Sequence, residues 1–272
     1  MTPATVIPPM NAKITRSIAE RLAREWHLAL GAVLPGATCS LVLEAGDDLV
    51  LKVPEPHAEE ARALPTLRAF SSHGGVKVLR ADELTGAVLM PRLRPGNTLA
   101  EAELDDLERV DVCARVIQSL RGSPLVDAPP LEADFVELQN GSSPLAKDAF
   151  KTFVWLAEST TRRTLLHGDL HHFNLLHHAG SWVAIDPKGV IGDPAHEVTG
   201  FMRNPVAQTP DAEGMAARLR RFADRLGDPP DRLWGWSFAQ TVLCATWGGI
   251  EGFADGWWAA AEALAECRQE FR

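Results

Sequence analysis

Long apolar segments and cysteine are both scarce in this chain of 272 residues. No segment combines a length of roughly 18 residues with the strongly apolar composition that a bilayer-crossing helix requires, so we expect no membrane partner. Residues 1–9 lack the basic region and the apolar core of a secretory signal. The four cysteines are scattered through apolar or helical patterns, which disfavours a disulfide framework and a zinc site. These absences predict a cytoplasmic protein.

Positive charge is scarce in the C-terminal part of the chain. Residues 1–97 carry 11 lysines and arginines against 10 acidic residues, whereas residues 98–272 carry 16 against 26. This acidity disfavours nucleic acid as a partner, because binding it requires neutralisation of phosphates. It favours a cationic small molecule, although an acidic surface also serves solubility alone. The remaining composition, 46% hydrophobic and 23% charged, is typical of a globular protein.

Strand-like segments come first in the chain and helical segments follow. Short apolar runs separated by turn signals predict strands at 39–44, 49–53, 76–80 and 87–91. Helical periodicity predicts helices at 11–30, 57–71, 98–120, 145–160, 211–226, 230–248 and 254–272. This order predicts an α+β protein with a small β-rich N-terminal lobe (1–93) and a larger helical C-terminal lobe (94–272).

Two of these helical segments contain a residue pattern that affects helix geometry. Pro65 lies inside the segment 57–71 and can kink a helix there. Thr98 and Glu101 have the spacing of a capping box, which predicts that the helix of segment 98–120 begins at this point.

The most informative segment is 167–174, with the sequence H-G-D-L-H-H-F-N. Asp169 and Asn174 are five residues apart, so on a tight loop both can face one cavity. A predicted strand pair after Asn174 returns Asp186 to the same place. Kinases use this H-x-D-L-x-x-x-N pattern and the following Asp to place a catalytic base and two metal ligands around ATP phosphates. A lone His-Gly-Asp is more often a capped turn, but the full set is rarely met by chance.

The N-terminal lobe offers one lysine for the ATP phosphates. Lys52 lies inside an apolar strand and alternates away from its apolar neighbours, which is unusual unless a lysine is paired or functional. A charge that protects an edge strand is the alternative. Glu60 precedes Leu64 and Leu67 on one helical face, and we predict it as the carboxylate that orients Lys52, with Glu59 as the alternative.

Residues 90–93 cross between the predicted lobes and form the expected adenine hinge. Pro91 has no N–H, so the backbone donor to adenine has to come from Arg92 or Leu93. The loop 34–40 contains a single glycine and not the G-x-G-x-x-G of many kinases, so it is weak evidence for phosphate binding.

A family resemblance rests on the segments 50–56, 166–174 and 184–194. They resemble the aminoglycoside phosphotransferase family, a relative of the protein kinases. The double histidine of the loop and the Asp-Pro-Lys-Gly turn are most similar to its streptomycin 6-kinase and hydroxyurea phosphotransferase branch. The resemblance spans about residues 30–255.

The resemblance implies a protein-kinase-like fold and an O-phosphotransferase that uses ATP and Mg²⁺. It implies that Asp169 accepts the proton of the acceptor hydroxyl. It also implies that Asn174 and Asp186 bind Mg²⁺, and that Lys52 binds the α- and β-phosphates of ATP.

The acceptor is less strongly indicated than the chemistry. An aminoglycoside carries cationic groups and many hydroxyls, so its pocket needs carboxylates. We predict Asp193, Glu197 and Glu251 as these carboxylates, although Asp193 equally suits a helix cap. Glu197 stands where the family usually has Asp, and residues 247–252 only partly match the family's segment near the substrate. Hydroxyurea, another sugar or an amino alcohol therefore stay open as acceptors.

Two other functional classes compete with a kinase. A metallohydrolase would hold a transition metal through the cluster His167, Asp169, His171 and His172. That class leaves Lys52 unexplained. The second class is a nucleotide-binding protein without catalysis, and the complete set of kinase side chains argues against it.

Overall fold

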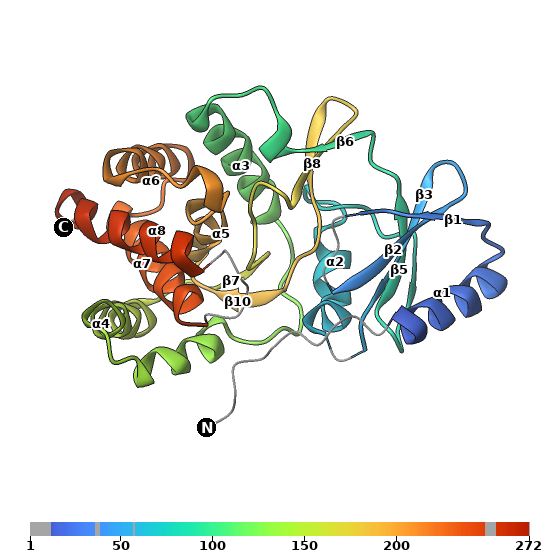
Figure 1. The fold of residues 1–272 in the computed structure, drawn as a ribbon, viewed down its shortest axis with the longest axis horizontal. Coiled ribbons are helices and arrows are strands. Elements are labelled where there is room, and N and C mark those ends of the chain that lie inside the picture. The colour runs from blue at the N-terminus through green and yellow to red at the C-terminus, as the bar shows by residue number, and fades with distance from the viewer. Residues whose placement is uncertain (1–11, 36–38, 57, 248–253, 272) are drawn as a thin grey trace.

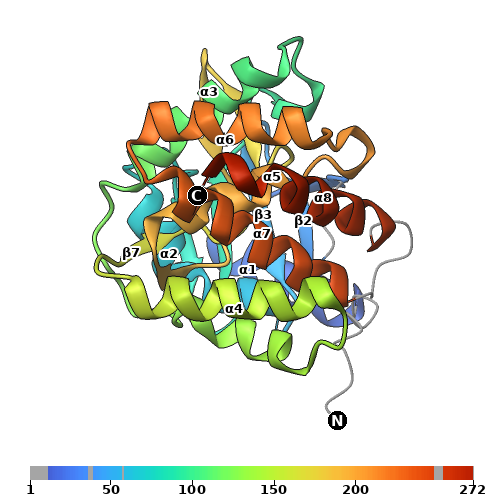
Figure 2. The same cartoon turned by 90° about the vertical axis from the view of Figure 1, so that its left-hand side faces the viewer.

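The computed structural model describes residues 12–35, 39–56, 58–247 and 254–271. An antiparallel sheet forms one end of the molecule and helices form the other (Figure 1). The view onto the helical end shows the gathered helices α4 (Pro144–Ser159), α6 (Ala212–Leu226), α7 (Pro230–Trp247) and α8 (Ala254–Glu266) (Figure 2). The α+β class predicted from the order of the elements is confirmed.

The N-terminal sheet has the strand order β1-β2-β3-β5-β4, and every neighbouring pair is antiparallel. Its strands are β1 (Leu30–Val33), β2 (Ser40–Ala45), β3 (Leu49–Pro54), β4 (Arg80–Asp82) and β5 (Ala87–Pro91). The helix α1 (Ala12–Trp26) covers one face, where its buried Leu22 shares an apolar cluster with Leu51 and Val53 of β3. Alternation along β3 therefore turns Lys52 toward the opposite face.

Two boundaries in this lobe differ from the predictions. The helix expected at 11–30 ends at Trp26, because His27 has a φ of 58° and the chain then enters β1. The strand expected at 76–80 contributes only its last residue to β4. The N–H of Val76 donates to the carbonyl of Ala184 instead, at 2.9 Å, so the start of this segment is bonded outside the N-terminal sheet.

The helix expected at 57–71 is divided in two. A 3-10 turn, η1 (Glu59–Arg62), is followed by α2 (Leu64–Phe70). Pro65 lies in the first turn of α2. A missing N–H costs no helical hydrogen bond at that place, so the proline starts a helix instead of kinking one.

Short strands and helices alternate in the C-terminal part. The strands are β6 (Pro95–Thr98), β7 (Thr164–Leu166), β8 (Leu175–His178), β9 (Ser181–Ala184) and β10 (Val190–Gly192). They form a β6-β8-β9 sheet and a β7-β10 pair. The further helices and turns are η2 (Leu99–Glu101), α3 (Asp106–Leu120), η3 (Leu131–Asn140), η4 (Pro194–Val198), α5 (Thr199–Met202), η5 (Val206–Gln208) and η6 (Cys267–Phe271).

The capping box of Thr98 and Glu101 is formed, but it opens only the short turn η2. Ala102 then adopts extended backbone with a ψ of 139°, which ends the turn. A second capping box opens α3, where the Asp105 side chain accepts a hydrogen bond from the N–H of Glu108 at 2.8 Å. The long helix expected to begin at the first box therefore begins at the second.

The chain leaves the N-terminal sheet at the end of β5 and joins β8 of the second sheet through β6. We therefore propose that the lobes 1–93 and 94–272 meet between these two strands.

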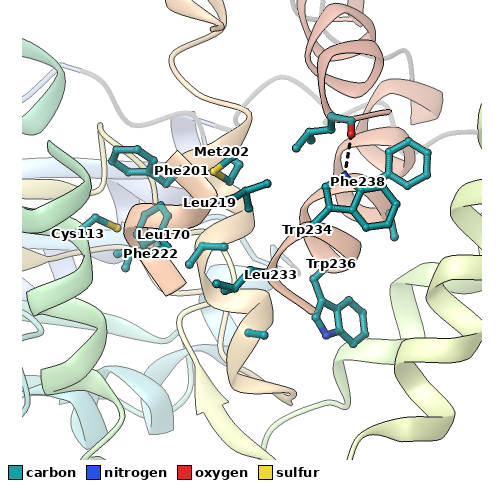
Figure 3. Close-up of a cluster of buried hydrophobic side chains, with 14 of the residues drawn as sticks. Cys113, Leu170, Phe201, Met202, Leu219, Phe222, Leu233, Trp234, Trp236 and Phe238 are labelled. Carbon is teal, nitrogen blue, oxygen red and sulfur yellow. Dashed lines mark hydrogen bonds between the residues drawn. The ribbon is translucent and has the colours of Figure 1, made fainter. Parts of the chain in front are cut away.

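The helix α7 forms the centre of the C-terminal core, and every residue from 233 to 245 is buried. Figure 3 shows Leu170 of the loop in the same apolar cluster as Phe201 and Phe222. Full burial of a leucine side chain contributes roughly 1.5–3 kcal/mol to the stability of the fold, so Leu170 anchors the loop in the core. Among the described residues, none of the helices has the length and apolar character needed to span a membrane.

Candidate active site

The segment 167–174 forms the loop between β7 and β8. The carbonyl of His167, at one end, accepts a hydrogen bond from the N–H of Lys188 at 2.9 Å. The carbonyl of Asn174, at the other end, accepts one from the N–H of Ile185 at 3.0 Å. The hairpin of β8 and β9 thus returns the chain, and Asp186 with it, to the loop.

Asp169 lies in this loop with a side chain that is 25% exposed. Its Oδ1 accepts a hydrogen bond from Nη2 of Arg203 at 2.7 Å, and its Oδ2 lies 3.6 Å from Nε2 of His171. Burial alone would raise the pKa of Asp169, but the neighbouring His171 and the positive charges of Arg203 and Lys188 lower the pKa well below its usual value. The carboxylate is therefore ionised at neutral pH, as the acceptor of a hydroxyl proton has to be.

Asn174 and Asp186 lie at the two ends of the hairpin that follows Asp169, where a backbone hydrogen bond from Ile185 to Asn174 brings those ends together. Nδ2 of Asn174 donates to the carbonyl of Asp169 at 2.9 Å, which directs the amide oxygen elsewhere. Asp186 is 35% exposed and has a φ of 57°, a backbone conformation that non-glycine residues adopt rarely and often at functional sites. Mg²⁺ prefers oxygen ligands and typically takes one or two protein groups together with substrate phosphates. The two side chains fit this requirement.

Lys52 reaches the same place from the other lobe. It lies opposite Val42 of β2 and Val88 of β5, so its strand is central and the edge-strand alternative is excluded. The side chain is 8% exposed, and Nζ lies 2.5 Å from Oδ1 of Asp186. Because an unpaired buried ammonium is costly, this ion pair accounts for the burial of Lys52.

The carboxylate partner of Lys52 differs from the prediction. Glu60 lies in the turn η1 and not in the helix that contains Leu64, so the helical phase used to place it does not exist. For the residues that the structure describes, the ion pair recorded for Lys52 is with Asp186. The helical argument for Glu60 is therefore lost, because Pro65 starts a new helix after the turn, and the pairing of Glu60 with Lys52 stays a prediction.

The hinge prediction needs a correction at Arg92. Its N–H donates to the carbonyl of Asp48 at 2.7 Å, and its guanidinium pairs with Glu44. Both groups are engaged within the N-terminal lobe, so this N–H does not serve adenine. Leu93 keeps the role of adenine donor as a proposal. Residues 36–38 of the preceding loop lie outside the described residues.

Glu197 lies behind the loop and not in an acceptor pocket. It is 4% exposed, and its two oxygens accept hydrogen bonds from the N–H groups of His167 at 2.7 Å and Gly168 at 3.1 Å. Burial raises the pKa of Glu197 to about 7, although the two hydrogen bonds act to lower it. The predicted contact with the acceptor is therefore wrong, and Glu197 holds the backbone of the loop.

Asp193 is enclosed in the same way, with 4% exposure. It pairs with Arg232, accepts a hydrogen bond from Nε1 of Trp236 at 2.9 Å, and caps η4 through the N–H of Ala195 at 3.0 Å. Burial would raise the pKa of Asp193, but these hydrogen bonds lower it. The capping alternative is the correct one, and the substrate assignment is wrong. Glu251, the third predicted carboxylate, lies outside the described residues.

The loop histidines do not converge on one point. His167 is buried, with Nε2 2.7 Å from the carbonyl oxygen of Ile185 and Nδ1 3.3 Å from the N–H of Asp169. His172 is also buried and stacks on Phe201, with ring centroids 3.9 Å apart. Within the described ranges, no three side chains of His, Cys, Asp or Glu are grouped to hold a metal ion. The cluster that a metallohydrolase would need is therefore not formed there.

Comparisons with known proteins agree with this fold and this site. The family model for aminoglycoside/hydroxyurea antibiotic resistance kinases matches residues 25–252. The chain belongs to this kinase family. The protein-kinase-like fold and the phosphotransferase class expected from the sequence are thereby confirmed.

Individual relatives of this family member are moderately similar to it. The streptomycin 6-kinase of Streptomyces griseus is 29% identical, over 92% of this chain and 89% of its own. The hydroxyurea phosphotransferase of Kitasatospora aureofaciens is 31% identical, over 85% of this chain and 72% of its own. Among solved structures, a choline/ethanolamine kinase family protein from Mesorhizobium loti has a TM-score of 0.68 at 18% identity, over 94% of this chain and 99% of that one.

Two residues of this kinase site were not predicted from the sequence. Arg203 contacts Asp169 from 34 positions away and belongs to none of the motifs. Gly200 lets α5 approach the loop, since a Cβ at this position would lie 2.6 Å from the carbonyl oxygen of Leu170. Neither residue carries a signal that a single sequence reveals.

Gly200→Ala is expected to lower the free energy of unfolding by about 1–3 kcal/mol, because the methyl group meets backbone that cannot move aside. This is the opposite of the usual gain from Gly→Ala in a helix. Gly235→Ala in α7 is the control, since its Cβ would meet only side-chain methyl groups at 3.2 Å or more. Denaturant unfolding of both variants measures the difference, and equal stabilities would contradict the close contact of α5 with the loop.

Proposed function

We propose that this protein is a cytoplasmic kinase that uses ATP and Mg²⁺ to phosphorylate a hydroxyl of a cationic, polyhydroxylated small molecule of the streptomycin type. The observation that carries this proposal is the ion pair of Lys52 with Asp186, which joins the N-terminal sheet to the hairpin that follows the loop of Asp169 and Asn174. Lys52 contacts Asp186, and Asn174 contacts the backbone of Asp169. No disulfide joins any of the four cysteines, all within the described residues, which supports a reducing compartment.

Each of the four side chains has one role in the reaction. Lys52 binds the α- and β-phosphates, and Asn174 and Asp186 hold Mg²⁺, which neutralises phosphate charge when bound. Asp169 orients the acceptor hydroxyl toward the γ-phosphate. The hydroxyl oxygen bonds to the γ-phosphorus, the bond to the β,γ-bridging oxygen breaks, and Asp169 takes the proton. Because the transition state is loose, positioning and charge neutralisation supply most of the acceleration.

The choice of acceptor rests on charge and on similarity to named relatives. Residues 98–272 carry 16 basic and 26 acidic residues, a balance that attracts a cation. The relatives at 29% and 31% identity are a streptomycin 6-kinase and a hydroxyurea phosphotransferase. The first of these acceptors is cationic and rich in hydroxyls, so it agrees better with the charge of the lobe.

The test is ATP consumption by the purified protein over a panel of acceptors. The panel contains streptomycin, other aminoglycosides, hydroxyurea, common sugars, choline and ethanolamine. We expect turnover with streptomycin, and mass spectrometry of the product should show one added phosphoryl group. Turnover only with a sugar or an amino alcohol would keep the chemistry and overturn the acceptor. A protein that binds no nucleotide would overturn the proposal as a whole.

A further inference from the structure

Arg203 is buried beside the catalytic carboxylate with most of its hydrogen-bonding capacity unused. Its side chain is 7% exposed, and Nη2 donates to Oδ1 of Asp169 at 2.7 Å. Nε and Nη1 are buried as well, yet neither has a hydrogen-bond partner among the residues that the structure describes. A buried guanidinium is costly unless it is paired and its N–H groups are bonded. The fold therefore keeps Arg203 at a cost, and its one recorded bond is to Asp169.

Two other arginines of the described chain, one buried and one partly buried, have a different pattern. Arg218, 2% exposed at its side chain, bonds to both oxygens of Asp106 and to backbone carbonyls. Arg232 bonds to Asp193, to the Thr160 hydroxyl and to the Ser159 hydroxyl. These arginines join elements of the fold through many bonds, whereas Arg203 is directed at a single carboxylate.

The surroundings of Arg203 hold it in a defined position. It caps the C-terminal end of α5, and Nη1 of Arg218 lies 3.4 Å from the carbonyls of Phe201 and Met202 and 3.3 Å from that of Asn204. The side chain of Asn204 donates to the carbonyl of Gly200 at 2.9 Å. Phe201 is fully buried in the core beneath the loop (Figure 3). The backbone on both sides of Arg203 is thus fixed to the core.

We infer that Arg203 is a positioning residue that holds the Asp169 carboxylate in one orientation for phosphoryl transfer, an inference that rests on the proposed catalytic role of Asp169. The bond to Oδ1 fixes the rotation of the carboxylate. Oδ2, at 3.6 Å from His171, is left for the acceptor hydroxyl. The bond is charge-assisted and therefore stronger than one between neutral groups.

Arg203→Gln is the first test. We expect kcat to fall roughly 100-fold, the typical result of misplacing a reacting group by about 1 Å, while KM for ATP stays unchanged. Two rates are measured: phosphoryl transfer to the acceptor, and hydrolysis of ATP without an acceptor. The variant and the wild type can therefore be compared even if the proposed acceptor is wrong. In the crystal structure of this variant, the Asp169 carboxylate should occupy more than one rotamer. A kcat near the wild-type value, or an unmoved Asp169, would overturn the inference.

Three further variants separate positioning from simple loss of stability. Arg203→Lys keeps a positive charge and should retain more activity than Arg203→Gln. Guanidinium ion should restore part of the activity of Arg203→Ala and none of that of Asp169→Asn. Arg232→Gln removes a partly buried arginine that bonds to Asp193 and not to Asp169, so its thermal stability should fall while kcat of the folded protein is kept. Equal loss of kcat in Arg232→Gln and Arg203→Gln, without rescue by guanidinium, would show a structural role alone.

Discussion

Asp169→Asn is expected to lower kcat by roughly 10²–10⁴-fold, the usual contribution of a general base, and to leave the affinity for ATP nearly unchanged. Asparagine keeps the size of the side chain but cannot take a proton from the acceptor hydroxyl. Its NH₂ group is also a hydrogen-bond donor, and it would face a second donor, either the guanidinium of Arg203 or the acceptor hydroxyl. The proposed nucleotide contacts come from Lys52, Asn174 and Asp186, which the substitution leaves in place.

Single-turnover kinetics and calorimetric titration of nucleotide measure these two quantities for Asp169→Asn. The matched control is Asp47→Asn, which removes the same charge from an exposed turn of the N-terminal lobe. The control should keep both kcat and nucleotide affinity. Wild-type turnover by Asp169→Asn would remove Asp169 from the mechanism, whereas loss of nucleotide affinity alone would place it in the ATP site.

Glu197→Gln is expected to lower the free energy of unfolding by about 1–3 kcal/mol, because it leaves one buried N–H of the loop without an acceptor. Both oxygens of Glu197 accept hydrogen bonds, from His167 and Gly168. A protonated carboxyl group still has lone pairs on both oxygens, but the NH₂ group of glutamine cannot accept. The variant should also lose activity, since His167 and Gly168 directly precede Asp169.

The same variant tests a pH dependence. Burial raises the pKa of Glu197 from the ordinary value of 4.5 to about 7, so between these values the folded protein holds a proton that the unfolded chain lacks. This contribution to stability is fully present below pH 4.5 and is lost as the pH rises through about 7. We expect the free energy of unfolding of the wild type to fall relative to that of Glu197→Gln across this window. Urea unfolding at several pH values measures it, and parallel curves for the two proteins would contradict the raised pKa.

The local motifs were predictable because their residues are near one another in the chain. Asp169 and Asn174 lie on one tight loop, and a hairpin of ten residues (175–184) cannot carry Asp186 far from it. Lys52 stood out because a lysine in an apolar strand needs a partner. The element boundaries were less predictable: Pro65 and Ala102 interrupt patterns that periodicity alone reads as continuous helices.

The roles of the acidic residues could not be read from their identity. Asp193 and Glu197 have the charge that a cationic acceptor requires, yet their partners Arg232 and the His167 N–H, both distant in sequence, enclose them in the interior. A carboxylate that is fully hydrogen-bonded inside the protein is not available to a substrate. Sequence alone does not tell such a group from one that faces a pocket.

By itself, the sequence determined the class of fold and the loop, hairpin and lysine that bring phosphotransfer chemistry together. Only the tertiary structure decided that Lys52 pairs with Asp186 across 134 residues, that Glu197 holds the loop, and that Arg203 holds Asp169. The physical reason is that a contiguous motif specifies local backbone geometry. Burial and hydrogen-bond partners instead depend on which distant segments the core packs against that motif.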